Sequence, residues 1–287
     1  AMGLARMGQL IRFIPVTVVI GFTNGIAVVI FLAQIKDFFG LQIDNLPAEF
    51  FGRIQTLAAN AHTIDLPTLA LASTCFIFLL SYNRLAQRFA VLRRAPGPLV
   101  VLIVGTLVSF VFSLPVETIG SRFNGIPQEL PNIGFPSLSI HDFGKLISPA
   151  ITIALLGAIE SLLSARVADS QIDDRHDPNQ ELIAQGLSNI AAPLFGGFAA
   201  TGAIARTTTN VKTGGRTPIA GIIHALVLLG IVLIAAPLAS YVPLATLSAI
   251  VMVVAVNMGE WHQFKELGRY TYNYRVILLT TFFVTVV

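Results

Sequence analysis

The feature that most constrains this chain is a set of long apolar runs that contain no charged residue. The longest such run covers residues 217–259. A helix needs about 20 mostly apolar residues to cross the hydrocarbon core of a bilayer, so this run is long enough for two. Shorter runs of the same kind recur along the chain. The sequence therefore predicts an all-α integral membrane protein.

The composition agrees with this prediction. Only 11% of the 287 residues are charged and 54% are hydrophobic, whereas a soluble domain carries about 25% charged residues. The net charge of +3 comes from Lys and Arg in short loops, a pattern of membrane topology and not of a nucleic-acid partner. Cys75 is the single cysteine, which excludes a disulfide within the chain and a thiolate metal cluster. No nucleotide or dinucleotide fingerprint is present, so we expect no cofactor.

The apolar runs, which hold few or no charged residues, give the expected spans. They cover residues 13–35, 66–83, 95–116, 146–167 and 181–194, with two more inside 217–259 and a last, shorter run at 276–287. The string "ASYVPLA" separates the two helices of the long run, and Pro243 starts the second. Asn24 and Gly25 interrupt the apolar pattern of the first helix, and close helix packing is the default interpretation there. Residues 260–270 are typical of an amphipathic helix on the inner surface, with an ordinary loop as the alternative.

The Lys and Arg residues give the orientation of the chain. With a cytoplasmic N-terminus, the inner segments hold about three times as many of them as the outer segments, as the positive-inside rule requires. We therefore expect the N-terminus to be cytoplasmic.

One segment does not fit a simple span. Residues 195–215 contain five glycines and five threonines, a composition that disfavours a continuous helix. Non-helical backbone at membrane depth occurs only where it is buried in protein or lines a cavity, and broken helices of this kind form binding sites in transporters. A helix that starts near Ala203 would point its free N–H groups, and its positive end, at such a site.

Two charged residues, Glu160 and Arg206, are expected well inside the bilayer. A central charge costs at least about 2.5–3.5 kcal/mol, so such residues usually face a partner or a polar path. Arg206 and the helix start at residues 202–205 would attract an anion. Glu160 would bind a coupling ion, helped by the neighbouring Ser161 and by Ser164 one helical turn later. The alternatives are a plain Glu160–Arg206 ion pair and hydroxyls that only pack helices.

Other functions have less support in the sequence. An intramembrane hydrolase could use Ser161 as nucleophile and His224 as base, but no nucleophile-elbow sequence is present, so we expect no enzyme. The remaining histidines share no metal-ligand spacing. A passive anion channel on the same scaffold stays open as an alternative.

Four long motifs carry a resemblance to a known family. They are "RFIPVTVVIGFTNGIAVVI" (12–30), "GAIESLLSARVAD" (157–169), "NQELIAQGLSNIAAPLFGG" (179–197) and "GAIARTTTNVKTGGRTPIAG" (202–221). Together they resemble the SulP, or sulfate permease, family, the bacterial relatives of solute carrier family 26. The resemblance covers nearly the whole chain.

The resemblance implies a fold and a domain plan. Members have two inverted seven-helix repeats, divided into a core and a gate domain that move as an elevator, with helix ten broken. On this pattern residues 1–118 hold gate helices five to seven, and residues 119–141 form an extracellular loop. Residues 142–240 hold core helices eight to eleven, and residues 241–287 return to the gate. We expect helices one to four, helix fourteen and the STAS domain to lie outside this chain.

The resemblance also implies site residues. The anion position between helices three and ten maps to Gly202, Ala203, Ile204 and Ala205, with Arg206 as the arginine of helix ten. The acidic position of helix eight maps to Glu160. Sodium-coupled bicarbonate members have Asp there, Thr four residues later and Thr near the start of helix ten, where this chain has Glu160, Ser164 and Ile204. Because one oxygen ligand is missing, a proton on a buried glutamate is favoured over sodium.

These expectations combine into one function. The chain is predicted to act in secondary active, proton-coupled anion transport in a bacterial inner membrane, as part of a homodimer. Sulfate, bicarbonate and a C4-dicarboxylate are the candidate substrates. A sodium-coupled bicarbonate symporter remains an alternative.

Overall fold

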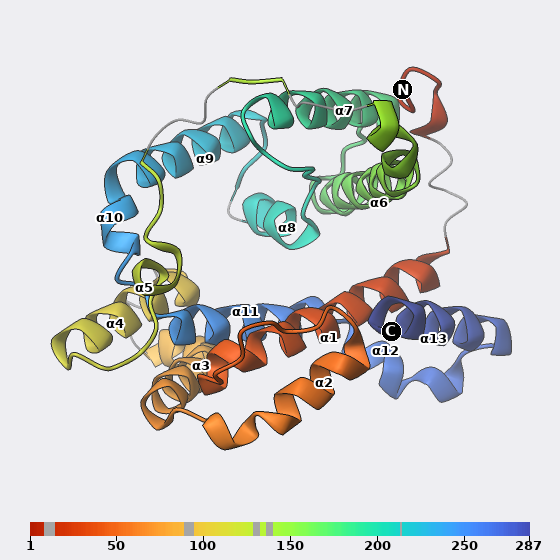
Figure 1. The fold of residues 1–287 in the computed structure, drawn as a ribbon. Helices are drawn as coiled ribbons and strands as arrows, with labels where there is room; N and C mark the ends of the chain where they lie inside the picture. The colour runs from red at the N-terminus through yellow and green to blue at the C-terminus, as the bar shows by residue number, and fades with distance from the viewer. Residues whose placement is uncertain (9–14, 89–94, 129–132, 136–139, 213) are drawn as a thin grey trace. The chain divides into compact units, whose positions relative to one another are not determined.

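The computed structural model describes residues 1–8, 15–88, 95–128, 133–135, 140–212 and 214–287, and within them the chain is helical without any extended strand (Figure 1). An isolated antiparallel bridge joins Thr118 and Pro243. The side chains of seven described residues, Asn83, Ile140, His141, Asp142, Ala205, Thr209 and Lys212, are not described. The contacts between Cα atoms divide the chain into two compact units: unit 1 holds Ala1–Ile14 and Glu129–Leu233, and unit 2 holds Pro15–Gln128 and Ile234–Val287.

Unit 2 is built from two stretches of the chain that pack together. Helix α1 lies against α11 and α13, and α3 packs on α11 and α4. Phe38, Cys75, Val101 and Met252 belong to its main apolar core. The elements are α1 (Val16–Phe39), α2 (Phe50–Ala59), η2 (Ala61–Thr63), α3 (Leu66–Arg88), α4 (Gly97–Val111), α5 (Ile119–Phe123), α10 (Ala236–Ala239), α11 (Leu244–Met258), α12 (Trp261–Lys265), η5 (Leu267–Arg269) and α13 (Tyr272–Val286).

The close helix packing expected at Asn24 and Gly25 is confirmed. Helix α1 runs unbroken through Asn24 and Gly25. The glycines allow α13 to approach closely, because a Cβ on Gly21 would lie 2.6 Å from the Leu278 carbonyl oxygen and one on Gly25 would lie 2.6 Å from Thr285 Cβ. The small residues therefore serve helix packing, as they often do between membrane helices.

Unit 1 holds the elements that surround the predicted site. They are α6 (Ile140–Ile172), α7 (Pro178–Leu194), α8 (Ile204–Lys212), α9 (Ile219–Gly230) and the start of the π-helix η4 (Ile231–Ala235). The Asp177 side chain caps α7 by accepting from the Asn179 amide (2.8 Å), and Pro178 occupies the first helical position, where a missing N–H costs nothing. Helix α6 packs against both α7 and α8, so it supports the site from one side.

Most of the predicted spans are confirmed as helices. Within the described ranges, three helices are long and apolar enough to cross a membrane: Val16–Phe39, Phe143–Ile172 and Ile219–Ala239. Shorter apolar helices cover Leu66–Tyr82, Gly97–Val111 and Leu244–Met258, the last of which follows Pro243 as predicted. Residues 13 and 14 of the first predicted span lie outside the described residues.

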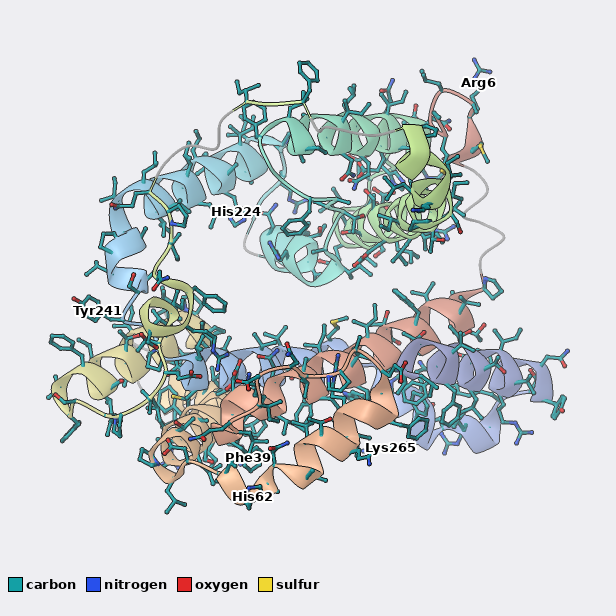
Figure 2. All side chains as sticks on the ribbon, in the orientation of Figure 1. Arg6, Phe39, His62, His224, Tyr241 and Lys265 are labelled. Atoms are coloured by element: carbon teal, nitrogen blue, oxygen red, sulfur yellow. The ribbon has the colours of Figure 1, made fainter. Side chains whose placement is uncertain are left out.

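Two details differ from the sequence prediction. Residues 260–270 form two short helices, α12 and η5, and not one amphipathic helix. Lys265 of α12 and His62 of η2 both lie exposed on unit 2 (Figure 2). Helix α2 was not expected, because the ten residues Phe50–Ala59 are too few for a span.

Candidate functional site

A break in the helical backbone lies at the centre of the predicted site. The chain leaves α7 at Leu194 and becomes helical again only at Ile204, where α8 begins. The helix start predicted near Ala203 is therefore confirmed. Just before it, Gly202 packs directly on α6, because a Cβ there would lie 3.2 Å from Ser161 Cα and 3.3 Å from Ser164 Cβ.

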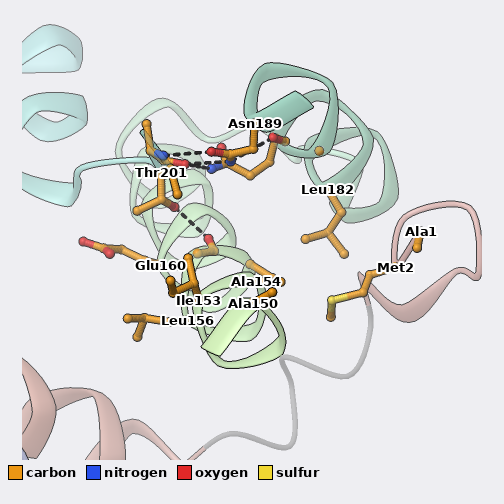
Figure 3. A pocket seen from close by; sticks show the side chains of 16 residues that line it. Ala1, Met2, Ala150, Ile153, Ala154, Leu156, Glu160, Leu182, Asn189 and Thr201 are labelled. Carbon is orange, nitrogen blue, oxygen red and sulfur yellow. Dashed lines mark hydrogen bonds between the residues drawn. The ribbon is translucent and has the colours of Figure 1, made fainter. Parts of the chain in front are cut away.

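Side chains of α7 and a backbone carbonyl of α6 hold this broken segment in place. The Asn189 side-chain amide donates to the Ala200 carbonyl oxygen (2.8 Å), and the Ala200 backbone amide donates back to Asn189 Oδ1 (2.8 Å). Gln185 Nε2 also donates to the Ala200 carbonyl. Thr201 Oγ1 donates to the Gly157 carbonyl of α6 (2.7 Å), as Figure 3 shows. Both backbone polar groups of Ala200, in the middle of the non-helical segment, thus find partners within unit 1.

The first turn of α8 offers free backbone donors. The Thr207 amide donates to the Ala203 carbonyl (2.9 Å) and closes the turn. The amides of Ile204 and Arg206 have no acceptor among the described residues, as expected of the first positions of a helix. The Arg206 side chain is exposed and forms no ion pair with a described residue. The arrangement can attract an anion, because a helix start carries about half a positive charge.

Glu160 lines a cavity of about 570 Å³ within unit 1. Its side chain is half-buried and lies on the opposite side of the cavity from Met2 and Leu182 (Figure 3). Among the described residues nothing donates a hydrogen bond to its carboxylate, and it forms no ion pair. The alternative of a plain Glu160–Arg206 ion pair is therefore not what this structure contains.

The two predicted serines are buried and hydrogen-bonded across helices. Ser161 is 1% exposed, and its hydroxyl donates to Glu181 Oε1 of α7. Ser164 shares a hydrogen bond of 2.8 Å with Thr207 Oγ1 of α8. His224 lies exposed on α9 (Figure 2), so the structure holds no Ser161–His224 pair of the kind a hydrolase needs.

The structure brings some of the predicted site residues together and leaves others apart. Gly202, Ser161 and Ser164 are in contact, and Ala203 and Ile204 follow directly into α8. Ala205 belongs to the first turn of α8, but its side chain is not described. Glu160 and Arg206 are not paired.

Sequence reasoning missed the polar residues of α7. Glu181, Gln185 and Asn189 recur every four residues, so they lie along one face of the helix. All three bond to α6 or to the broken segment. That spacing in the sequence was the signal that could have revealed them.

A comparison with protein-family models matches residues 1–281 to the sulfate permease family. YvdB of Bacillus subtilis, which is named as a candidate sulfate transporter, is 41% identical over 99% of this chain and 53% of its own length. The chain spans about half the length of the curated relatives that it matches.

Two solved structures have the same fold. The transmembrane domain of a cyanobacterium bicarbonate transporter, BicA, matches with a TM-score of 0.87 and 30% identity, over 99% of this chain and 70% of that domain. The structure of SLC26A9 matches with a TM-score of 0.82 and 21% identity, over 99% of this chain and 46% of that protein. The first comparison supports relationship as well as fold, and the second shows the fold alone.

Proposed function

Because the chain belongs to the sulfate permease family, we propose that it forms part of a secondary active anion transporter in a bacterial inner membrane. The observation that carries this proposal is the broken backbone before α8, which is fixed to α6 and α7 and leaves free amides at the helix start. Relatives of the chain are named as transporters of sulfate and of bicarbonate, and not as enzymes.

In this proposal the anion binds at residues 202–206. The amides of the first turn of α8 would donate hydrogen bonds to it, and the Arg206 guanidinium would add a full positive charge close to the helix end. The absence of an ion pair on Arg206 among the described residues supports this role, since no carboxylate competes for it.

Glu160 is proposed to carry the coupling proton, with Ser161 and Ser164 beside it. A carboxyl group on the wall of a largely apolar cavity can exist in its neutral, protonated form at modest cost. A sodium site would need a further side-chain oxygen at position 204, and Ile204 has none. This chain therefore offers fewer oxygen ligands than sodium would require.

The domain plan belongs to the same proposal. We assign residues 142–240 to a core domain, and residues 1–118 and 241–287 to a gate domain of a homodimeric elevator. Helices α6, α7 and α8, which surround the broken segment, fall together in the proposed core.

Uptake by proteoliposomes that hold the full-length protein tests this function. Sulfate, bicarbonate and succinate are compared under an inward proton gradient, an inward sodium gradient and no gradient. Accumulation of one anion against its gradient when protons are supplied is the expected result. Fast passive equilibration without any gradient dependence would favour a channel, and dependence on sodium alone would replace the proton.

A further inference from the structure

Glu181 is a charged residue of unit 1 to which no role has yet been given. It lies in the first turn of α7 and is half-buried. Its carboxylate accepts the hydroxyl proton of Ser161, which comes from α6 and is 1% exposed. No described cation pairs with Glu181. The buried Ser161 hydroxyl therefore hydrogen-bonds a carboxylate on another helix.

This contact fixes the direction of the Ser161 hydroxyl. A serine hydroxyl has one proton to donate and two lone pairs that accept, whereas an ionised carboxylate only accepts. While Glu181 is ionised, the proton of Ser161 must point at Glu181. The serine oxygen then presents only lone pairs to everything else around it. It can serve a cation or a proton donor, and it cannot donate a hydrogen bond to an anion.

The hydroxyl oxygen of Ser161 lies beside the predicted site. The position of a Cβ on Gly202 is 3.6 Å from Ser161 Oγ, so the serine oxygen faces the backbone just before α8. Glu160 is the neighbouring residue on α6. A change at Glu181 can therefore reach the coupling-ion position through one hydrogen bond, without contact between Glu181 and the ion.

Other charged groups share the elements around Glu181. Within the described residues, none of them pairs with Glu181, and the pair that does form among them is Asp169–His176, at 2.6 Å. They are Arg6 of the N-terminal segment, Lys145, Glu160, Arg166 and Asp169 of α6, Asp173, Asp174, Arg175 and His176 of the following turn, Asp177 beside α7, and Arg206 of α8.

We propose that Glu181 is a positioning residue of the coupling-ion site, which holds Ser161 as an acceptor for the ion and adds a negative charge behind it. This inference rests on the proposed function. It assigns Ser161 to the coupling ion and not to the anion, and it places the control of that serine on α7.

The test is the pH dependence of anion uptake by the full-length protein in proteoliposomes. Unchanged protein is compared with Glu181→Ala, Ser161→Ala, the double variant and Glu181→Gln. Loss of the acceptor should weaken proton binding about tenfold, because a hydrogen bond to a charged group is one of the stronger polar contacts. The pH of half-maximal uptake should therefore fall by about one unit in Glu181→Ala, by somewhat less in Ser161→Ala, where the charge of Glu181 remains, and in the double variant by no more than in Glu181→Ala. Glu181→Gln, which keeps an acceptor and loses the charge, should shift it less.

Gln180→Ala is the matched control, since Gln180 is an exposed neighbour in the same helical turn. It should leave the pH profile unchanged. The proposal is overturned by an unchanged pH profile in Glu181→Ala, even if that variant is less stable, or by shifts that add in the double variant. If Glu181→Ala does not fold, an unchanged profile in Glu181→Gln overturns it equally.

The unchanged protein separates this proposal from the function on which it rests. If its uptake follows sodium and not pH, the proton part of the proposed function fails by itself. The sodium concentration that gives half-maximal uptake is then measured for the same variants. It should rise about tenfold in Glu181→Ala and Ser161→Ala. A constant sodium requirement across the variants would contradict the role of Glu181.

Discussion

Gly202 leaves little room for a side chain at the point where the chain approaches α6. A Cβ at this position would lie 3.2 Å from the backbone of Ser161, and backbone cannot turn aside as a flexible side chain can. Gly202→Ala should displace the start of α8 and raise the anion KM of the full-length protein about tenfold, since misplaced binding groups are costly. Gly268→Ala is the control, because a Cβ there meets nothing within 4 Å. Equal KM values in the two variants would contradict this reading.

Arg206 gives a second prediction at the residue scale. Arg206→Ala should raise the anion KM by about tenfold to a hundredfold, because a hydrogen bond to a charged group is worth about 1.5–3 kcal/mol. Arg206→Lys should retain part of the affinity, since it keeps the charge and loses the planar guanidinium. Arg216→Ala, at an exposed arginine in the loop after α8, is the control and should behave as the unchanged protein. Unaltered affinity in Arg206→Ala would remove Arg206 from the site.

At the residue scale, the sequence predicted where the backbone is broken better than it predicted which side chains hydrogen-bond to each other. The glycines and threonines of residues 195–215 were enough to predict the break, because they disfavour a helix whatever surrounds them. The Ser161–Glu181 and Ser164–Thr207 hydrogen bonds were not predictable. They depend on the register between separate helices, which packing decides and composition does not.

Asn24 gives a prediction at the scale of the element. It is fully buried in α1, and neither atom of its amide has a hydrogen-bond partner among the described residues. A buried unpaired polar group costs about 1–3 kcal/mol. Asn24→Leu, which is similar in size, should leave the free energy of unfolding unchanged or raise it by about 1 kcal/mol in thermal unfolding of detergent-solubilised protein. A clear loss of stability would show that the amide has a partner.

A substitution at Gly21 in the same helix should have the opposite effect on stability to Asn24→Leu. Gly21→Ala should lower the free energy of unfolding by about 1–3 kcal/mol, because the added Cβ would press on the Leu278 carbonyl of α13. The sequence indicated close helix packing at Asn24 and Gly25 but did not identify α13 as the partner. An interior glycine weakens a helix by only about 1 kcal/mol, and close packing against α11 and α13 outweighs that cost.

At the scale of the whole molecule, the predicted orientation is open to a direct check. Asp44, between α1 and α2, and Lys265, in α12, are both exposed and are predicted to lie on opposite sides of the membrane. Cysteines introduced as Asp44→Cys or Lys265→Cys in a Cys75→Ala background should differ in labelling. A membrane-impermeant maleimide should reach position 44 from outside intact cells and position 265 only after permeabilisation. The reverse pattern would invert the topology.

Helix content and spans were predictable because the bilayer imposes length and apolarity on each helix. The division into two units was expected only from the family resemblance, because it depends on contacts between stretches far apart in sequence, such as α1 with α11 and α13, which composition does not reveal. Nor does composition reveal the cavity beside Glu160, whose walls come from α6, α7 and the broken segment.

The central claim is that Glu160 carries the proton that drives anion uptake. Uptake by the full-length protein in proteoliposomes, measured from acidic to alkaline pH for unchanged protein and for Glu160→Gln, tests it most directly. Glutamine keeps the size of the side chain and cannot titrate. The account predicts that the pH dependence and the accumulation against a gradient are lost in Glu160→Gln while anion binding remains. An unchanged pH dependence in that variant would contradict it.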